Sequence, residues 1–222
     1  MKLFIDSGDI QVIEKAVASG VVDGVTTNPS LLAKTGVIGR NKASLHDYYA
    51  QICQIVGGDV SAEVISTDHD AMVEEGRELA SINPHIVVKV PMTEAGVKAI
   101  KTLKEANIRT NCTLIFSVAQ AMLAAKAGAF YISPFIGRLD DAGQIGDGVR
   151  LVERICDVIA YYGFATEVLA ASIRNLQHVE QCAEAGADVA TCPYSVFEAM
   201  FKHPLSDAGL KKFLSDYEKA KA

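Results

Sequence analysis

The sequence predicts an α/β protein made of one domain, a (β/α)8 barrel with an extra helix at its C-terminal end. Three observations support this prediction. Short runs of β-branched residues alternate with amphipathic stretches along the whole chain, which is typical of parallel strands joined by helices. No long structureless linker interrupts this alternation. A length of 222 residues is also sufficient for a TIM barrel built as one domain.

Eight runs have the composition of buried strands, because they are short and rich in Val, Ile and Thr. They are Lys2–Asp6, Gly24–Thr27, Val60–Ile65, Ile86–Val90, Arg109–Ile115, Ala129–Ser133, Glu167–Ala171 and Val189–Thr191. The clearest helical stretches between them are Asp68–Ser81, Glu94–Glu105, Ser117–Lys126, Gly148–Tyr162, Asn175–Ala185 and Tyr194–Phe201. Ala-Gly-Ala turns at 127–129 and 185–187 fit helix ends that lead into strands.

The barrel is predicted to occupy residues 1–205, and residues 206–222 are predicted to form a charged helix beyond the eighth βα unit. Ser206 and Asp207 are suitable residues to cap the start of this helix. Its apolar residues recur at helical spacing and therefore share one side. They are Leu210, Phe213, Leu214 and Tyr217. We expect this side to pack on the barrel or on a neighbouring subunit.

Composition and charge exclude several classes of protein. Half of the residues are hydrophobic and 22% are charged, which is enough apolar material for a large core and unlike a disordered chain. The net charge of -6 at pH 7 argues against a nucleic-acid partner, because phosphates require a basic surface. No apolar run has the length of a membrane-spanning helix or of the core of a signal peptide, so no membrane partner is expected.

The cysteines point to a reducing compartment. Their number is odd, and their spacing fits neither a disulfide framework nor a metal site. They are Cys53, Cys112, Cys156, Cys182 and Cys192. We therefore expect reduced thiols, a cytoplasmic protein and no bound metal.

One lysine interrupts an apolar run. Lys89 follows Ile86-Val87-Val88 and precedes Val90, in a segment with the composition of a strand buried on both faces. A buried ammonium group costs several kcal/mol unless it is paired or loses its proton. A neutral lysine amine is a nucleophile, and its most common use is a Schiff base with a carbonyl substrate. The alternative is a lysine at a strand end that extends its amine into water.

Polar side chains fall at the C-terminal ends of seven predicted strands, which is the end of such a barrel that carries the active site. In chain order they are Asp6, Asn28, Glu63, Lys89, Asn111, Thr113, Ser133, Arg138, Ser172 and Arg174, with Phe135 among them. Each has a simpler interpretation when taken alone. Asp6 could cap the helix that begins near Asp9, and Asn28 could belong to a turn. Glu63 could be a structural ion-pair partner, and Arg138 could form a solvated pair with Asp140.

Taken together, these residue types suit chemistry on a phosphorylated ketone that carries hydroxyl groups. Lys89 would attack the ketone, and the carboxylates of Asp6 and Glu63 would move protons during carbinolamine formation and carbon–carbon cleavage. Amide and hydroxyl groups would recognise substrate hydroxyls, and guanidinium groups would bind phosphate oxygens. The first set is Asn28, Asn111 and Ser133, and the second is Arg138 and Arg174 with the hydroxyl of Ser172.

The motifs that contain these residues resemble those of the transaldolase/fructose-6-phosphate aldolase family, in its small single-domain subfamily. The resemblance covers residues 1 to 205, and its most specific part is the block Gly24-Val25-Thr26-Thr27-Asn28-Pro29-Ser30. The other parts are Asp6, Val88-Lys89-Val90-Pro91, Asn111-Cys112-Thr113, Ser133-Pro134-Phe135-Ile136-Gly137-Arg138 and Ala171-Ser172-Ile173-Arg174.

The resemblance implies a transaldolase of the non-oxidative pentose phosphate pathway, without metal or organic cofactor. A dihydroxyacetone unit would pass from sedoheptulose 7-phosphate to glyceraldehyde 3-phosphate, giving erythrose 4-phosphate and fructose 6-phosphate. By resemblance, Lys89 forms the Schiff base, Asp6 is the acid and base for the carbon–carbon bond, and Glu63 and Thr113 position a water. The substrate contacts implied are Asn28, Asn111, Ser133, Phe135, Arg138, Ser172 and Arg174. The resemblance also implies a homo-oligomer, either a pentamer or a decamer.

Two positions bear on the nearest alternative, a fructose-6-phosphate aldolase that releases free dihydroxyacetone. The aldolases carry Gln and Tyr where this chain has Glu63 and Phe135. A nearby phenol can help to protonate the carbanion, whereas an inert ring leaves it waiting for an aldehyde. Both positions therefore favour transfer. A sugar-phosphate-binding barrel without catalysis is the non-enzymatic alternative, and it is disfavoured by the presence of four residues suited to catalysis, Asp6, Glu63, Lys89 and Thr113.

Overall fold

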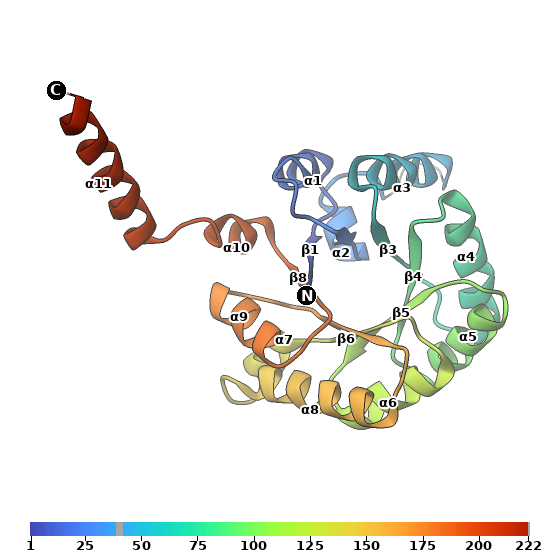
Figure 1. Cartoon of the computed structure of the whole chain (residues 1–222). Coiled ribbons are helices and arrows are strands. Elements are labelled where there is room, and N and C mark those ends of the chain that lie inside the picture. The colour runs from blue at the N-terminus through green and yellow to red at the C-terminus, as the bar shows by residue number, and fades with distance from the viewer. Residues whose placement is uncertain (39–41, 222) are drawn as a thin grey trace.

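The structure is a computed structural model that describes residues 1–38 and 42–221, and it confirms the predicted (β/α)8 barrel (Figure 1). Residues 39–41 of the predicted barrel and Ala222 of the predicted tail helix lie outside the described residues. Eight parallel strands close in sequence order, with β8 paired to β1. They are β1 (Lys2–Asp6), β2 (Gly24–Thr26), β3 (Asp59–Glu63), β4 (Ile86–Pro91), β5 (Thr110–Ile115), β6 (Tyr131–Pro134), β7 (Glu167–Ala170) and β8 (Val189–Cys192).

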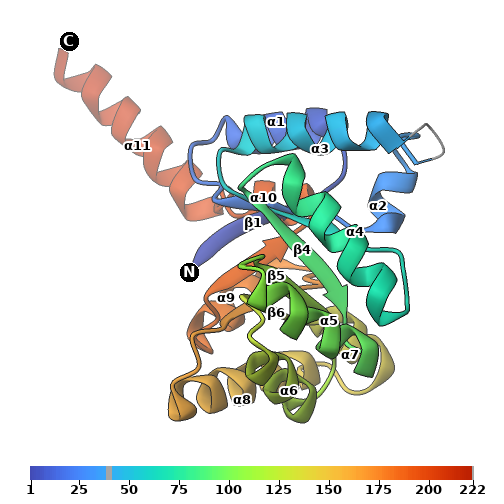
Figure 2. The same cartoon turned by 90° about the vertical axis from the view of Figure 1, so that its right-hand side faces the viewer.

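Helices follow the strands and surround the barrel (Figure 1 and Figure 2). They are α1 (Ile10–Val17), α2 (Pro29–Ala33), α3 (Lys42–Val56), α4 (His69–Ile82), α5 (Glu94–Glu105), α6 (Val118–Ala127), α7 (Ile136–Ala142), α8 (Asp147–Tyr162), α9 (Leu176–Glu184), α10 (Tyr194–Ala199) and α11 (Pro204–Lys221). Side-chain oxygens cap the starts of α1, α2, α4, α5, α6 and α9 and satisfy amides that have no partner within the helix. Gly128 ends α6 with a φ of 92°, as the Ala-Gly-Ala turn predicts.

Strand β3 ends at Glu63 and not at Ile65 as predicted. The amide of Val64 still donates to the carbonyl of Lys89, at 3.0 Å. The amides of Ile65 and Ser66 turn away and donate to the carboxylate of Glu75 on α4. A side chain from a helix has therefore replaced the neighbouring strand as acceptor, which the pattern of apolar residues could not reveal.

The C-terminal helix α11 starts at Pro204 and not at Ser206. Proline is favoured in the first turn of a helix because its φ is already suitable and its missing N–H is not needed there. The described part of α11 contains no buried residue, and the helix extends away from the barrel in Figure 1 and in Figure 2. Leu205, Leu210 and Phe213 are each more than half exposed. The helix thus does not pack on its own barrel.

Two hydrophobic layers hold the barrel together. The larger lies between the strands and the surrounding helices, and the smaller consists of residues inside the barrel. The buried members of the inner layer are Phe4, Val87, Tyr131, Leu169, Ala171 and Val189. Because side chains alternate between the two faces of a strand, residues two positions further along point into the barrel as well. The inner layer therefore predicts which side chains lie above it.

Ion pairs close the N-terminal end of the barrel beneath this layer. Arg109 pairs with Asp59 at 2.8 Å, and the hydroxyl of Tyr131 donates to the same carboxylate at 2.9 Å. Lys2 pairs with Glu167 at 2.8 Å. These contacts place charge at the end of the barrel opposite to the predicted site, where they serve structure.

Candidate active site

A polar layer lies directly above the inner hydrophobic layer, at the C-terminal end of the barrel. Some of its residues come two positions after a residue of the inner layer on the same strand. The others belong to the strands in between. The polar layer consists of Asp6, Thr26, Ser61, Glu63, Lys89, Asn111, Ser133 and Thr191. Glu63 is the register partner of Lys89 in the β3–β4 ladder, and Lys89 is that of Asn111 in the β4–β5 ladder. Backbone pairing therefore places these three side chains next to one another.

The amine of Lys89 lies inside the barrel, not in water. Its side chain is 6% exposed, which excludes the interpretation as a lysine that reaches the surface. Nζ lies 2.9 Å from Oε2 of Glu63 and donates to the carbonyl of Thr27 at 3.1 Å. The buried charge is thus paired, as the cost of burial requires. The pair also places a proton acceptor beside the amine.

The carboxyl of Asp6 is the second acidic group of the site. Thr26 Oγ1 donates to its Oδ1 at 2.7 Å, and the α1 cap is formed by Asp9 instead, so the interpretation of Asp6 as a helix cap is wrong. Burial raises the pKa of Asp6 above its ordinary value of 3.8, and the Thr26 bond and the charge of Lys89 oppose this rise. A carboxyl group with a raised pKa is better suited to exchange protons near neutral pH.

Asn111 and Ser133 form a buried hydrogen-bond chain across three strands. Ser133 Oγ donates to Asn111 Oδ1 at 2.7 Å, and Asn111 Nδ2 donates to Ser61 Oγ at 3.1 Å. This chain fixes the orientation of the Asn111 amide, which is fully buried beneath Ser133. Asn111 therefore orients the hydroxyl of Ser133, which lines the smaller cavity.

Thr113 carries a polar atom without a partner. Its Oγ1 is buried and makes no hydrogen bond in the part of the chain that the structure describes. The next residue, Leu114, has a φ of 64° at a register irregularity between β5 and β6. Positive φ is costly for such a residue, and strain of this kind gathers at functional sites. Thr113 is thus available to a ligand or to a water.

The side chains predicted to bind the substrate phosphate lie on α7 and on the loop after β7. The guanidinium of Arg138 lies 4.9 Å from the ring centroid of Phe135, and Asp140 contacts His178 instead, so the alternative interpretation of Arg138 as a surface partner of Asp140 is wrong. Arg174 pairs with Asp141 at 2.8 Å.

Backbone contacts join these two segments. The amide of Gly137 donates to the carbonyl of Ser172 at 3.0 Å. A Cβ atom at Gly137 would lie 2.4 Å from that oxygen, so only glycine fits at this close approach. The φ of Ser172 is 58°, in the left-handed region.

Two cavities meet at Lys89. The smaller, of about 120 Å³, is lined by Asp6, Thr26, Ser133, Ser172 and Thr191 among others. The larger, of about 560 Å³, is lined by Glu63, Thr113, Leu114 and Arg174 among others. Asn28, Lys89, Phe135 and Arg138 line both. Asn28 also caps α2 through its Oδ1, so it has a role beyond the simple turn.

This arrangement places one carboxylate in each cavity with the amine between them. Every residue predicted for the site lines one of the two cavities except Asn111, which lies beneath Ser133 in the chain described above. A carbonyl carbon that reached Lys89 would meet Asp6 on one side and Glu63 on the other. The geometry thus fits addition of an amine to a carbonyl with proton transfer on both sides.

Competing nucleophiles near the site are suppressed. Burial raises the pKa of the Cys112 and Cys192 thiols to about 12, so neither forms a thiolate near neutral pH. Burial likewise raises the pKa of Tyr49 to about 12, and its hydroxyl lies 3.3 Å from Thr27 Oγ1. Tyr49 supports the loop whose carbonyl accepts from Lys89.

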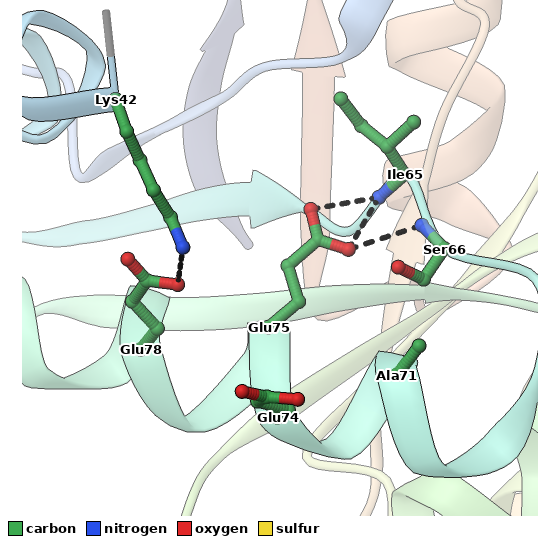
Figure 3. Close-up of a pocket in the computed structure, with 7 residues that line it drawn as sticks. All are labelled: Lys42, Ile65, Ser66, Ala71, Glu74, Glu75 and Glu78. Carbon is green, nitrogen blue, oxygen red and sulfur yellow. Dashed lines mark hydrogen bonds and ion pairs between the residues drawn. The ribbon is translucent and has the colours of Figure 1, made fainter.

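A third pocket, of about 470 Å³, lies outside the barrel beside α4 (Figure 3). Figure 3 shows Glu75 pointing at the amides of Ile65 and Ser66, with Lys42 turned toward Glu78. Glu74 is the remaining acid of this pocket. Because Glu75 is already satisfied by two amides, its role is to hold the chain that leaves Glu63.

Three further polar residues of the polar layer were not predicted from the sequence as site residues, and they are Thr26, Ser61 and Thr191. Thr191 Oγ1 lies 2.7 Å from Thr26 Oγ1, and Ser61 ends the chain from Asn111. The signal was available, because each is a hydroxyl residue at an inward position of a strand that is otherwise apolar. Its detection requires knowing which face of each strand points inward.

The described residues contain no group of three or more His, Cys, Asp or Glu side chains arranged to hold a metal ion. None of the described helices is long and apolar enough to cross a membrane.

Comparison with known proteins gives consistent results. A sequence profile described as "Transaldolase/Fructose-6-phosphate aldolase" matches residues 3–222. A "Probable transaldolase" of Parabacteroides distasonis is 59% identical over 219 residues, covering 99% of each chain. A protein of the same description from Porphyromonas gingivalis is 58% identical, covering 99% of this chain and 98% of its own. A thiamine phosphate pyrophosphorylase from Pyrococcus furiosus shares the fold, with a TM-score of 0.61, 15% identity and coverage of 86% and 85%.

Proposed function

Because the chain belongs to the transaldolase/fructose-6-phosphate aldolase family, we propose that it transfers a dihydroxyacetone unit between sugar phosphates through a Schiff base on Lys89. The donor would be sedoheptulose 7-phosphate and the acceptor glyceraldehyde 3-phosphate, in the non-oxidative pentose phosphate pathway. The observation that carries the proposal is the buried amine of Lys89, with Glu63 at 2.9 Å and Asp6 across the smaller cavity. The close relatives described as probable transaldolases support it.

Schiff-base formation begins with the loss of a proton from Lys89. Glu63 is the nearest acceptor, at 2.9 Å. The neutral amine then adds to the ketone carbon, and the carbinolamine loses its hydroxyl group as water. Glu63 and the unpartnered hydroxyl of Thr113 line the same cavity and would hold that water.

Cleavage follows once the imine can accept electrons. The carboxylate of Asp6 takes the proton from the C4 hydroxyl, the C3–C4 bond breaks, and an aldose phosphate leaves. The three-carbon unit stays on Lys89 as an enamine. The acceptor aldehyde adds to it, and the new alkoxide takes the proton back from Asp6. The raised pKa of Asp6 suits both directions of this transfer.

The fate of the enamine separates the proposal from the alternative, a fructose-6-phosphate aldolase. The ring of Phe135 faces both cavities and carries no acidic proton. It therefore leaves the enamine unprotonated until an aldehyde arrives. An aldolase would release free dihydroxyacetone at a similar rate without any acceptor.

Borohydride trapping tests the proposal. With fructose 6-phosphate, wild-type protein should yield a reduced adduct on the peptide that contains Lys89. The Lys89→Met variant has a similar volume at this position and should keep the fold while losing both adduct and turnover. An adduct on another lysine, or full activity of the variant, would refute the Schiff-base role.

Location and assembly are part of the same proposal. Five unpaired cysteines support a cytoplasmic protein. The exposed apolar residues of α11, such as Leu210 and Phe213, support contact with a second copy in a pentamer or decamer. Elution at the mass of the 23.7 kDa chain would contradict an oligomer.

A further inference from the structure

Asp140 and His178 form a contact that no step of the proposed reaction uses. Asp140 lies on α7 and His178 on α9, and their side chains are 9% and 10% exposed. Nε2 of His178 lies 3.3 Å from Oδ2 of Asp140. The other carboxylate oxygen of Asp140 accepts from the amide of Gly148 at 2.8 Å, so one carboxylate joins α7, α8 and α9.

The second ring nitrogen of His178 extends this contact to the phosphate site. Nδ1 accepts a long hydrogen bond, 3.4 Å, from the amide of Arg174. An accepting Nδ1 carries no proton, so the neutral ring holds its proton on Nε2, which is the nitrogen that faces Asp140. The chain Arg174–His178–Asp140 thus has one donor and one acceptor at each step.

The position of Asp140 on α7 gives this contact a consequence for Arg138. Residues two apart on a helix point about 200° from each other. Asp140 is therefore anchored at the back of α7, while Arg138 faces the two cavities. Arg174, in turn, lines the larger cavity and belongs to the segment that His178 holds. Arg174 also pairs with Asp141 of α7 at 2.8 Å, so the placement of α7 affects the positions of both arginines.

We propose that Asp140 and His178 are positioning residues that set the separation of Arg138 and Arg174 and thereby the affinity of the site for the phosphate of its substrate. The inference rests on the proposed function, since it concerns the phosphate site of that reaction. We call the contacts of Asp140 with His178 and Gly148 the brace. Replacing Asp140 with Asn should break it, because an amide has one acceptor oxygen whereas Asp140 uses two. Either His178 or Gly148 would then face another donor.

The test compares a phosphorylated ketone with an unphosphorylated one. The concentrations of fructose 6-phosphate and of dihydroxyacetone that give half-maximal borohydride trapping at Lys89 are measured in wild type, Asp140→Asn and Asp157→Asn. Asp157 lies on the exposed side of α8 and controls for loss of a carboxylate. Asp140→Asn should raise the half-maximal concentration of fructose 6-phosphate about tenfold and leave the half-maximal concentration of dihydroxyacetone unchanged. Asp157→Asn should change neither concentration.

Two results would show that the brace serves only stability and would overturn the inference. One is an equal change of the half-maximal concentration for both ketones, and the other is a smaller fraction of trapped protein with both half-maximal concentrations unchanged. If Asp140→Asn does not fold, His178→Asn tests the same contact, because its shorter side chain keeps an acceptor near Arg174 and cannot reach Asp140. Wild-type protein that traps neither ketone would refute the proposed function itself, and the role of the brace with it.

Discussion

Thr26 Oγ1 donates a hydrogen bond of 2.7 Å to Asp6 Oδ1, and Thr191 Oγ1 lies 2.7 Å from the same threonine oxygen. A hydroxyl group has one hydrogen, so when Thr26 donates to Asp6, it is Thr191 that donates to Thr26. The bonds run in one direction from β8 through β2 to β1. They stabilise the ionised form of Asp6, whereas burial favours its protonated form.

Replacing Thr26 with Val should raise the pKa of Asp6 further, because the bond that stabilises its anion is lost. Asp6 must be ionised to accept the C4 proton. The acidic limb of the pH profile of kcat/KM should therefore move to higher pH, by about one unit. Thr191→Val, which leaves the Thr26 bond in place, should move it less. Profiles that coincide with wild type would contradict an acid–base role for Asp6.

The raised pKa of Asp6 also predicts how stability depends on pH. As pH rises above 3.8, the unfolded chain loses the Asp6 proton first, while the folded protein retains it. The stability that this protonated carboxyl contributes is lost as pH rises through its raised folded-state pKa. The Asp6→Asn variant cannot ionise at this position, so its stability does not fall in this pH range. The Tm of the variant should therefore increase relative to the Tm of the wild type as the pH goes from acid to neutral, and a difference that stays constant would contradict the prediction.

Phe135→Tyr should raise the release of free dihydroxyacetone from fructose 6-phosphate in the absence of an acceptor. A phenol at this position would lie between both cavities and could donate a proton to the enamine. Transfer to erythrose 4-phosphate should fall in parallel, because protonation competes with aldehyde addition. Phe116, whose ring centroid lies 5.8 Å from that of Phe135, offers a control as Phe116→Tyr. Unchanged release would discredit the argument from the phenol.

Tyr131→Phe should separate stability from catalysis. The change keeps the ring in the inner layer and removes the hydroxyl that donates to Asp59 at 2.9 Å. The free energy of unfolding should fall by about 1 kcal/mol, as measured by urea denaturation. The ion pair of Asp59 with Arg109 remains and limits the loss. Because Asp59 lies at the opposite end of the barrel from Lys89, kcat should stay unchanged, and a lower kcat in folded protein would count against this division.

The sequence was most informative where a charged residue stands within an apolar segment. Lys89 in an apolar strand predicted its own burial, and the alternation of strands and helices predicted the barrel. Of the two partners of Lys89, Glu63 was predicted as a site residue, whereas the backbone carbonyl of Thr27 could not be predicted, because it does not depend on the type of side chain. The hydroxyls of Thr26 and Thr191 belong to strands distant in sequence, and their contact depends on the closure of the barrel. The true end of β3 depends on Glu75, a long-range acceptor on a helix.

The row formed by Glu63, Lys89 and Asn111 has a consequence for how activity is lost on heating. Their placement comes from paired strands, not from loops that open on their own. Fraying of surface segments leaves such a row intact, whereas separation of β3 from β4 requires the barrel itself to open. Amide hydrogens in this part of the ladder should therefore exchange with solvent only through cooperative unfolding. Thermal inactivation and thermal melting should then follow the same curve.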